Sequence, residues 1–176
     1  QALEFAWDAD PKSAYGGVVA LNRACSLEVA ERLKGRFIEI IAAPAFADDA
    51  LAYLKRKNAD LRIVTIDISR LREVEDEFHC IGGIGLTTVI DRPMEMEFRT
   101  ATATPMPAGM NGLLRFGVIS CAHLKSNAAS LVCRTPDGSG MMQLGMGCGQ
   151  PNRIDALERL AIPKALEKSL ELFGRT

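Results

Sequence analysis

The sequence has no excess of charge of either sign, few aromatic residues and only two histidines. Its 21 basic and 22 acidic side chains give a formal net charge of −1, so no basic field attracts a phosphate backbone and we expect no nucleic-acid partner. No apolar run reaches the roughly 18 to 20 residues of a membrane-spanning helix, and residues 1–20 lack the order of a signal peptide. We therefore expect no membrane association and a cytoplasmic location.

The five cysteines are odd in number, and none stands in a Cys-x-x-Cys pair. This usage favours reduced thiols in a core over a disulfide framework. The neighbours His79-Cys80 and Cys121-Ala122-His123 lack the spacing of a zinc site, and no second cluster completes four ligands. We predict no metal site.

Strands and helices are predicted to alternate in the first part of the chain. Apolar strand-like runs and amphipathic helical segments follow one another at residues 18–21, 27–33, 37–43, 48–57 and 61–67. Ser26 is a good N-cap for the first helix, and the second has acids in its first turn and bases in its last, which suits the helix dipole. This order implies parallel strands joined by right-handed crossovers.

The rest of the chain is predicted to add a strand at 86–90, a helix at 110–123, strands at 128–134 and 141–147, and a helix at 151–173. A break or kink is expected in that last helix at Pro163. We predict one α/β layer domain over residues 1–176, with helices on both faces of its sheet.

Three glycines, Gly145, Gly147 and Gly149, precede Pro151 and Arg153 at the predicted start of the last helix. Glycine lets backbone approach a ligand without a Cβ in the way, and proline suits the first helical position. A cation at a helix start is repelled unless an anion lies between, so the pattern predicts a cradle for phosphate or carboxylate. The spacing fits neither the dinucleotide fingerprint nor the P-loop, and a tight strand-to-helix turn stays open as the alternative.

Two more polar segments fall at strand or helix ends, where α/β sheets place ligands. Asp10 opens the loop of residues 9–17, and the alternative for it is an Asp-Pro turn in which Asp10 bonds its own backbone. Asn127 ends a Lys-Ser-Asn triplet, and its alternative is a solvated loop in which Asn127 is a C-cap. Neither segment forms a catalytic triad or a nucleophile elbow, so no single cluster establishes catalysis.

Taken together, four separated segments resemble AICAR transformylase, the formyltransferase half of bifunctional purine-biosynthesis proteins that also carry IMP cyclohydrolase. They are ADPKSAYGGVVALNR at 9–23, IAAPAF at 41–46, HLKSNA at 123–128 and GMGCGQPNRID at 145–155. The resemblance covers essentially the whole chain and implies a three-layer α/β/α, cytidine deaminase-like fold. Neither His-x-Glu nor Pro-Cys-x-x-Cys occurs, so this fold is expected without the zinc site.

The resemblance implies formyl transfer from 10-formyltetrahydrofolate to the 5-amino group of AICAR, an imidazole carboxamide ribotide, by a homodimer. It implies a catalytic role for Asn127, as an amide donor or as the group that fixes the formyl end of the folate. Substrate contacts are expected from Asp10, Asn127, Gln150 and Arg153. Ile154, together with Asn127, is expected to line the folate side.

Two parts of the family pattern are not found in this sequence: a Lys-His pair in a Lys-His-x-x-Pro-x-Gly segment, and a C-terminal portion rich in Phe and Asp. A weakly active or inactive chain is then expected when it is alone, whether it is a fragment, a piece of a split enzyme or a reduced paralogue. The alternative function is a non-catalytic relative that binds a purine-pathway nucleotide or serves as an assembly subunit. An unrelated nucleotide-binding α/β module is a third possibility. The formyl donor, folate or formate with ATP, is left open.

Overall fold

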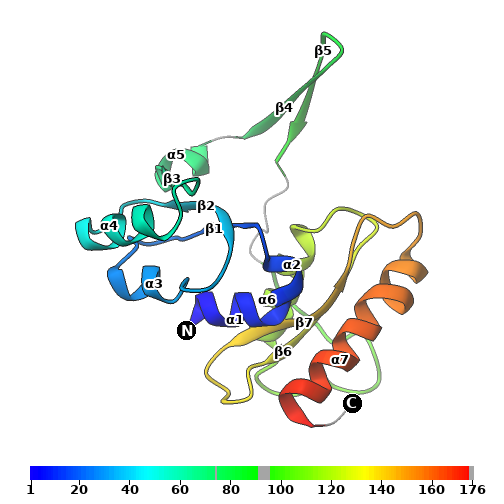
Figure 1. Ribbon diagram of the computed structural model, residues 1–176. Coiled ribbons are helices and arrows are strands. Elements are labelled where there is room, and N and C mark those ends of the chain that lie inside the picture. The colour runs from blue at the N-terminus through cyan, green and yellow to red at the C-terminus, as the bar shows by residue number, and fades with distance from the viewer. Residues whose placement is uncertain (74, 91–95, 175–176) are drawn as a thin grey trace. The chain divides into compact units, whose positions relative to one another are not determined.

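The computed structural model describes residues 1–73, 75–90 and 96–174 (Figure 1). The chain divides into two compact units, Asp10–Ile90 and Gln1–Ala9 with Asp91–Thr176. Both units combine helices with strands, which confirms the α/β class. The described strands lie in three separate sheets, so the single domain and the three-layer arrangement stay predictions.

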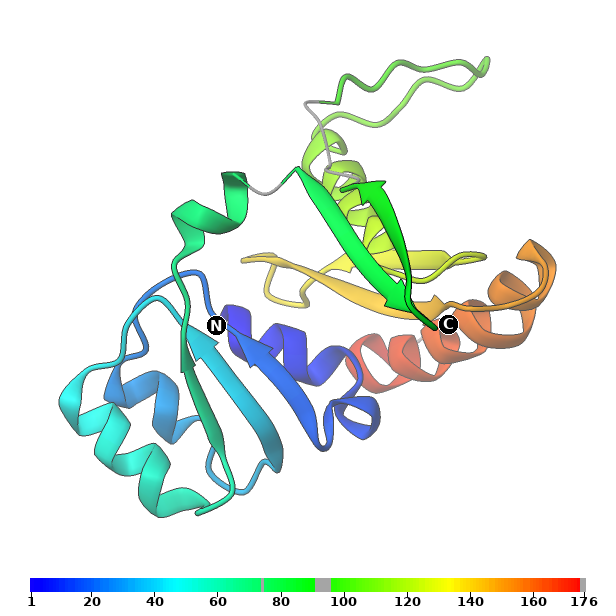
Figure 2. The ribbon, with the colours of Figure 1, turned by 90° about the horizontal axis from the view of Figure 1, so that it is seen from above.

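The unit Asp10–Ile90 is built on a parallel sheet with strand order β1-β2-β3. Its strands and the helices between them are β1 (Gly17–Ala20), α3 (Leu27–Glu31), β2 (Ile38–Ala43), α4 (Asp48–Lys57) and β3 (Arg62–Thr65). Figure 2 shows α3 and α4 side by side on one face of this sheet. The predicted β-α-β-α-β order with parallel strands is confirmed.

Local sequence signals explain these elements. The Ser26 Oγ accepts a hydrogen bond from the Val29 N–H at 3.4 Å, as an N-cap does. Helix α4 begins with two aspartates and ends with three basic residues, as the dipole favours. The core of the unit is formed by apolar side chains that are at most 1% exposed, among them Cys25, Leu33, Ile38, Ile41 and Leu54.

The same unit contains an antiparallel hairpin, β4 (Asp76–Ile81) and β5 (Ile84–Val89). Its two-residue turn is Gly82-Gly83, and both glycines have positive φ, 57° and 83°, as tight hairpin turns demand. The sequence predicted the second strand only. The two remaining helices of the unit are α2 (Pro11–Ala14) and α5 (Ile68–Glu73).

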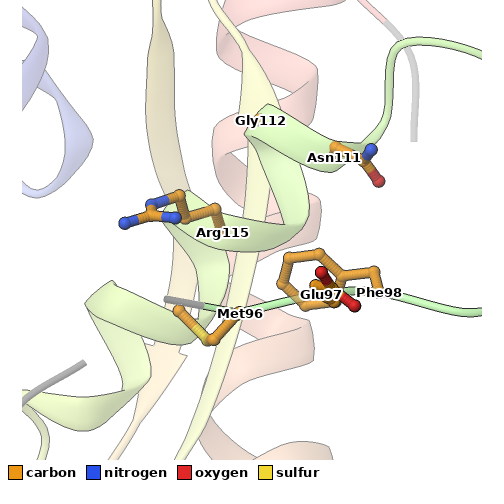
Figure 3. A pocket seen from close by; sticks show the side chains of 6 residues that line it. All are labelled: Met96, Glu97, Phe98, Asn111, Gly112 and Arg115. Carbon is orange, nitrogen blue, oxygen red and sulfur yellow. The ribbon is translucent and has the colours of Figure 1, made fainter. Parts of the chain in front are cut away.

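In the other unit, helices pack against an antiparallel pair of strands, β6 (Ala129–Arg134) and β7 (Met141–Gly147). Helix α6 (Asn111–Ala122) contacts β6, while α1 (Ala2–Ala9), the π-helix η1 (Asp155–Ala161) and α7 (Ile162–Phe173) contact β7. Figure 3 shows α6 in front of the two strands and α7 behind them. These elements position the predicted Asn127 and Arg153.

The last helix differs from its prediction in both start and winding. It was expected to begin at Pro151, but Asn152 caps it. The Asn152 Oδ1 accepts a hydrogen bond from the Asp155 N–H at 2.8 Å, and the Asn152 Nδ2 donates one to the Asp155 Oδ2 at 2.8 Å. Residues 155–161 wind as a π-helix that continues into α7. Helical backbone continues through Pro163, so the chain does not break there, and the winding changes from π to α between Ala161 and Ile162, next to the proline.

The turn between β6 and β7 is held by the Asp137 carboxylate. Its Oδ1 accepts from the Thr135 hydroxyl at 2.6 Å and from the Ser139 N–H at 3.0 Å, and its Oδ2 accepts from the Ser139 hydroxyl at 2.7 Å. The Thr135 hydroxyl, followed by the Ser139 hydroxyl and N–H, lowers the pKa of Asp137 to about 2.

Because the folded-state pKa lies below the ordinary value of 3.8, the ionised Asp137 stabilises the fold above that pH, and the stabilisation is lost as the pH falls toward about 2. We expect wild type to melt at a higher temperature than Asp137→Asn at about pH 6, and the difference to shrink toward about pH 2. Thermal melts of both proteins across this range measure it. A difference that is independent of pH contradicts the expectation.

Candidate functional site

Two loop segments extend the β6–β7 pair beyond the end of the sheet. Asn127 and Gln150 exchange two backbone hydrogen bonds with N···O distances of 3.3 Å, and the Gly149 N–H donates to the Lys125 carbonyl at 2.6 Å. The segment before β6 is thereby fixed to the segment between β7 and the last helix. The sequence placed both segments at element ends but gave no sign of this pairing.

The Asn127 side chain reinforces the same turn. Its Nδ2 donates to the carbonyl oxygens of Gln150 and Pro151, both at 3.1 Å. Since carbonyl oxygens only accept, these contacts fix which end of the amide is nitrogen. Both N–H groups are used, and the Oδ1 has no hydrogen-bond partner among the residues that the structure describes. In this arrangement the side chain offers a ligand an acceptor, because both of its N–H groups are bonded within the turn. The C-cap alternative is wrong, because His123 holds that position of α6.

Gln150, Arg153 and Ile154 follow on the other side of the turn. The Gln150 Nε2 donates to the Cys148 carbonyl at 3.1 Å, which leaves its Oε1 free within the described part of the chain. Arg153 is exposed in the first turn of the last helix, and its guanidinium bonds no described residue. The Ile154 residue is 65% exposed. The structure thus brings four predicted residues to one end of the β6–β7 pair.

Asp10, the fifth predicted residue, lies in the other unit, where it is the N-cap of α2. Its Oδ1 accepts from the Ser13 N–H at 3.0 Å and its Oδ2 from the Ser13 hydroxyl at 2.8 Å. The local turn proposed as the alternative for Asp10 is confirmed.

The glycines do not form the predicted anion cradle. A Cβ on Gly145 or Gly147 would lie closer than 3.0 Å to the carbonyl oxygen of Ala161 or Ala156, because the helix backbone occupies that space. These two glycines therefore serve helix packing and not ligand approach. Gly149 supplies a turn with φ of +66°, and its N–H is already bonded to a carbonyl. The alternative of a tight strand-to-helix turn is correct for Gly149 only, because Gly145 and Gly147 lie within strand β7.

Chemically, this end of the unit combines acceptors, cations and apolar surface. The free oxygens of Asn127 and Gln150 can accept from an amine or an amide N–H. Lys125 and Arg153 are exposed cations with no ion-pair partner among the described residues, and they can hold an anion. Ile154 can pack against a ring. Lys125 was not among the predicted binding residues, although it stands in the same Lys-Ser-Asn triplet.

A pocket of about 420 Å³ lies elsewhere, at the start of α6 (Figure 3). It is lined by Met96, Glu97, Phe98, Asn111, Gly112 and Arg115. None of the predicted site residues lines it. Its lining includes one acidic side chain, Glu97, and one basic side chain, Arg115. It adds nothing to the site at the end of β6 and β7.

The described residues contain no group of three or more His, Cys, Asp or Glu side chains placed to hold a metal ion. Over the same residues, no helix has the length and apolar character needed to cross a membrane.

Comparison with known proteins identifies the family. The model of the AICARFT/IMPCHase bienzyme family matches residues 1–164. The bifunctional purine biosynthesis protein PurH of Lactiplantibacillus plantarum is 40% identical over 95% of this chain and 32% of its own length. PurH of Lactobacillus delbrueckii subsp. bulgaricus is 39% identical over 94% of this chain, and PurH of Halalkalibacterium halodurans is 36% identical over 96%. The chain spans 32% of the length of each of these relatives. The chain belongs to the AICARFT/IMPCHase bienzyme family.

Proposed function

We propose that this chain takes part in purine biosynthesis by transfer of a formyl group from 10-formyltetrahydrofolate to the 5-amino group of AICAR. The observation that carries the proposal is the free Oδ1 of Asn127, fixed by two hydrogen bonds at one end of a unit that also presents Arg153 and Ile154. Family membership supplies the reaction class. The proposed enzyme is a cytoplasmic homodimer with the cytidine deaminase-like layers of the family.

In this reaction the amine nitrogen of AICAR bonds to the formyl carbon, the amine loses a proton, and the bond from the formyl carbon to the folate nitrogen breaks as that nitrogen takes up a proton. Asn127 Oδ1 would accept a hydrogen bond from the amine and so direct its lone pair at the formyl carbon. An amide oxygen is too weak a base to remove the proton, so Asn127 orients the nucleophile and another group accepts the proton.

The other residues recognise the two substrates. Arg153 would pair with the anionic or carboxamide part of AICAR, assisted by the Gln150 oxygen as an acceptor for the amide N–H. Ile154 would contact the folate ring through its exposed side chain.

Isothermal titration calorimetry with AICAR, with and without a reduced folate, tests the proposal. We expect binding of AICAR that the folate strengthens. Arg153→Ala should weaken it by about 10- to 100-fold, the value of one charge-assisted hydrogen bond, with no change in melting temperature. Arg159→Ala is the matched control, because Arg159 lies in the same helix with 78% of its side chain exposed and pairs with Asp155 at 2.9 Å. Absence of AICAR binding with and without folate rejects a working site in this chain and favours a fragment or an assembly subunit.

A further inference from the structure

Lys125 lies in the turn that holds the candidate site, and the proposed function gives it no role. Its carbonyl oxygen accepts a hydrogen bond from the Gly149 N–H at 2.6 Å, and two residues later Asn127 and Gln150 exchange two backbone hydrogen bonds at 3.3 Å. Two residues span at most about 7 Å, so the Cα atom of Lys125 lies no farther than that from the Cα atom of Asn127. Because the bond to Gly149 uses the backbone of Lys125, the side chain can be replaced without loss of this contact.

The Lys125 ammonium group has no carboxylate to neutralise it. The residue is exposed, and no ion pair joins it to any residue that the structure describes. No acidic residue occurs at 123–134 or 141–154, the two segments that meet at the turn. The next carboxylate along the chain, Asp155, is already paired with the Arg159 Nε at 2.9 Å. The turn therefore carries a positive charge that an anionic ligand can balance.

The space beside this part of the turn is open. Gly149, the hydrogen-bond partner of Lys125, has no side chain, and nothing lies within 4 Å of the position that a Cβ would take there. Lysine carries its charge on a flexible four-carbon stem with three rotatable N–H donors. A cation of this kind, held at its base and free at its tip, suits an anion on a flexible, solvent-exposed part of a ligand.

Both substrates of the proposed reaction are anions. AICAR carries a phosphate, and 10-formyltetrahydrofolate carries the carboxylates of its glutamate. Arg153 is proposed to pair with AICAR, and its planar guanidinium suits a phosphate because it can bind two oxygens at once. The folate carboxylates then have no cation among the proposed site residues. Within the part of the chain that the structure describes, Lys125 is the remaining lysine or arginine at this turn without an ion-pair partner.

We propose that Lys125 binds a carboxylate of the folate glutamate. The inference rests on the proposed function and adds a residue to the folate side of its site. In a folate the aminobenzoyl ring separates the formyl-bearing nitrogen from the glutamate. When the formyl carbon lies at Asn127, the glutamate therefore lies about one ring length away, within reach of a lysine whose Cα atom is at most about 7 Å from that of Asn127.

Isothermal titration calorimetry with 10-formylfolate and with 10-formylpteroate tests the contact, because the two compounds differ only by the glutamate. We expect Lys125→Ala to bind 10-formylfolate about two- to fivefold more weakly than wild type does, the range for an exposed ion pair, and to bind 10-formylpteroate as wild type does. Lys125→Arg keeps the charge and should retain most of the affinity. Lys55→Ala is the matched control, since it removes one exposed cation from α4 in the other unit and should change neither affinity.

The outcomes separate this contact from the proposed function. An equal loss of affinity for both compounds in Lys125→Ala, or no loss for either, overturns the contact. A loss of affinity for AICAR alone also overturns it and assigns Lys125 to the phosphate. Wild type that fails to bind 10-formylfolate overturns the contact as well, whether or not it binds AICAR. If wild type binds both substrates and Lys125→Ala matches it, the contact is wrong and the proposed function stands.

Discussion

Gly147→Ala is expected to destabilise the unit that contains β7 by about 3 kcal/mol or more, the upper range for forcing extra volume into a packed site. The new methyl group would lie inside contact distance of the Ala156 carbonyl oxygen and of the Leu160 Cβ. The obstacle is mainly helix backbone, which cannot rotate out of the way as a side chain can. Either η1 must move off β7 or the strand must bend, and both lose buried contacts.

Urea unfolding followed by circular dichroism measures the loss. Gly112→Ala is the control, because Gly112 lies in helix α6 and nothing lies within 4 Å of its Cβ position. That change should raise stability by up to about 1 kcal/mol, since alanine is the better helix former. If Gly147→Ala unfolds at the urea concentration of wild type, the close packing of η1 on β7 is wrong.

This packing also shows why the glycine run was misinterpreted from the sequence. A missing Cβ permits close approach, but the sequence does not say whether the approaching group is a ligand or a helix. At Gly145 and Gly147 it is the helix. Only the three-dimensional course of residues 155–161, wound as a π-helix, decides between the two.

Elements with strong local signals were predictable. The Ser26 cap and the charge order of α4 act within one or two turns, and the parallel strands follow from the order of elements. Exposure does not explain why strand β4 was missed, because β5 is equally exposed and was predicted. The difference lies in the residue types: β4, DEFHCI, begins with two acidic residues that continue a charged stretch, whereas β5, IGLTTV, is rich in β-branched residues. The residues of the candidate site came from the resemblance to the family, whose model matches residues 1–164, and their roles remain proposals.

The hydrogen-bonding role of Asn127 could not be predicted from the sequence either. An asparagine side chain can donate or accept with equal ease, and which end is free depends on its neighbours. Here the carbonyls of Gln150 and Pro151, more than 20 residues away in the chain, take both N–H groups. This arrangement makes Asn127 a support of the turn as well as a contact for the ligand.

Asn127→Ala is expected to lower the affinity for AICAR by about 10- to 100-fold, since two hydrogen bonds worth roughly 1 kcal/mol each are lost from the turn together with the ligand acceptor. Asn127→Asp is expected to lower the affinity for AICAR by at least as much. A carboxylate of the same shape cannot donate, so an anionic oxygen would face the two carbonyl oxygens and push the turn apart. Calorimetric titration with AICAR measures both effects.

Gln150→Glu is the matched control, because it makes the same exchange in the neighbouring amide, whose nitrogen donates only one hydrogen bond. Its effect should be smaller than that of Asn127→Asp. If Asn127→Asp binds AICAR as wild type does while Asn127→Ala does not, the ligand depends on the acceptor at this position and the two bonds to the turn are dispensable. Loss of binding in both Asn127 variants, with binding kept in Gln150→Glu, makes the geometry of the turn essential. The aspartate keeps the acceptor but replaces the two donors with a negative charge, and the Gln150→Glu control carries the same charge at the neighbouring position.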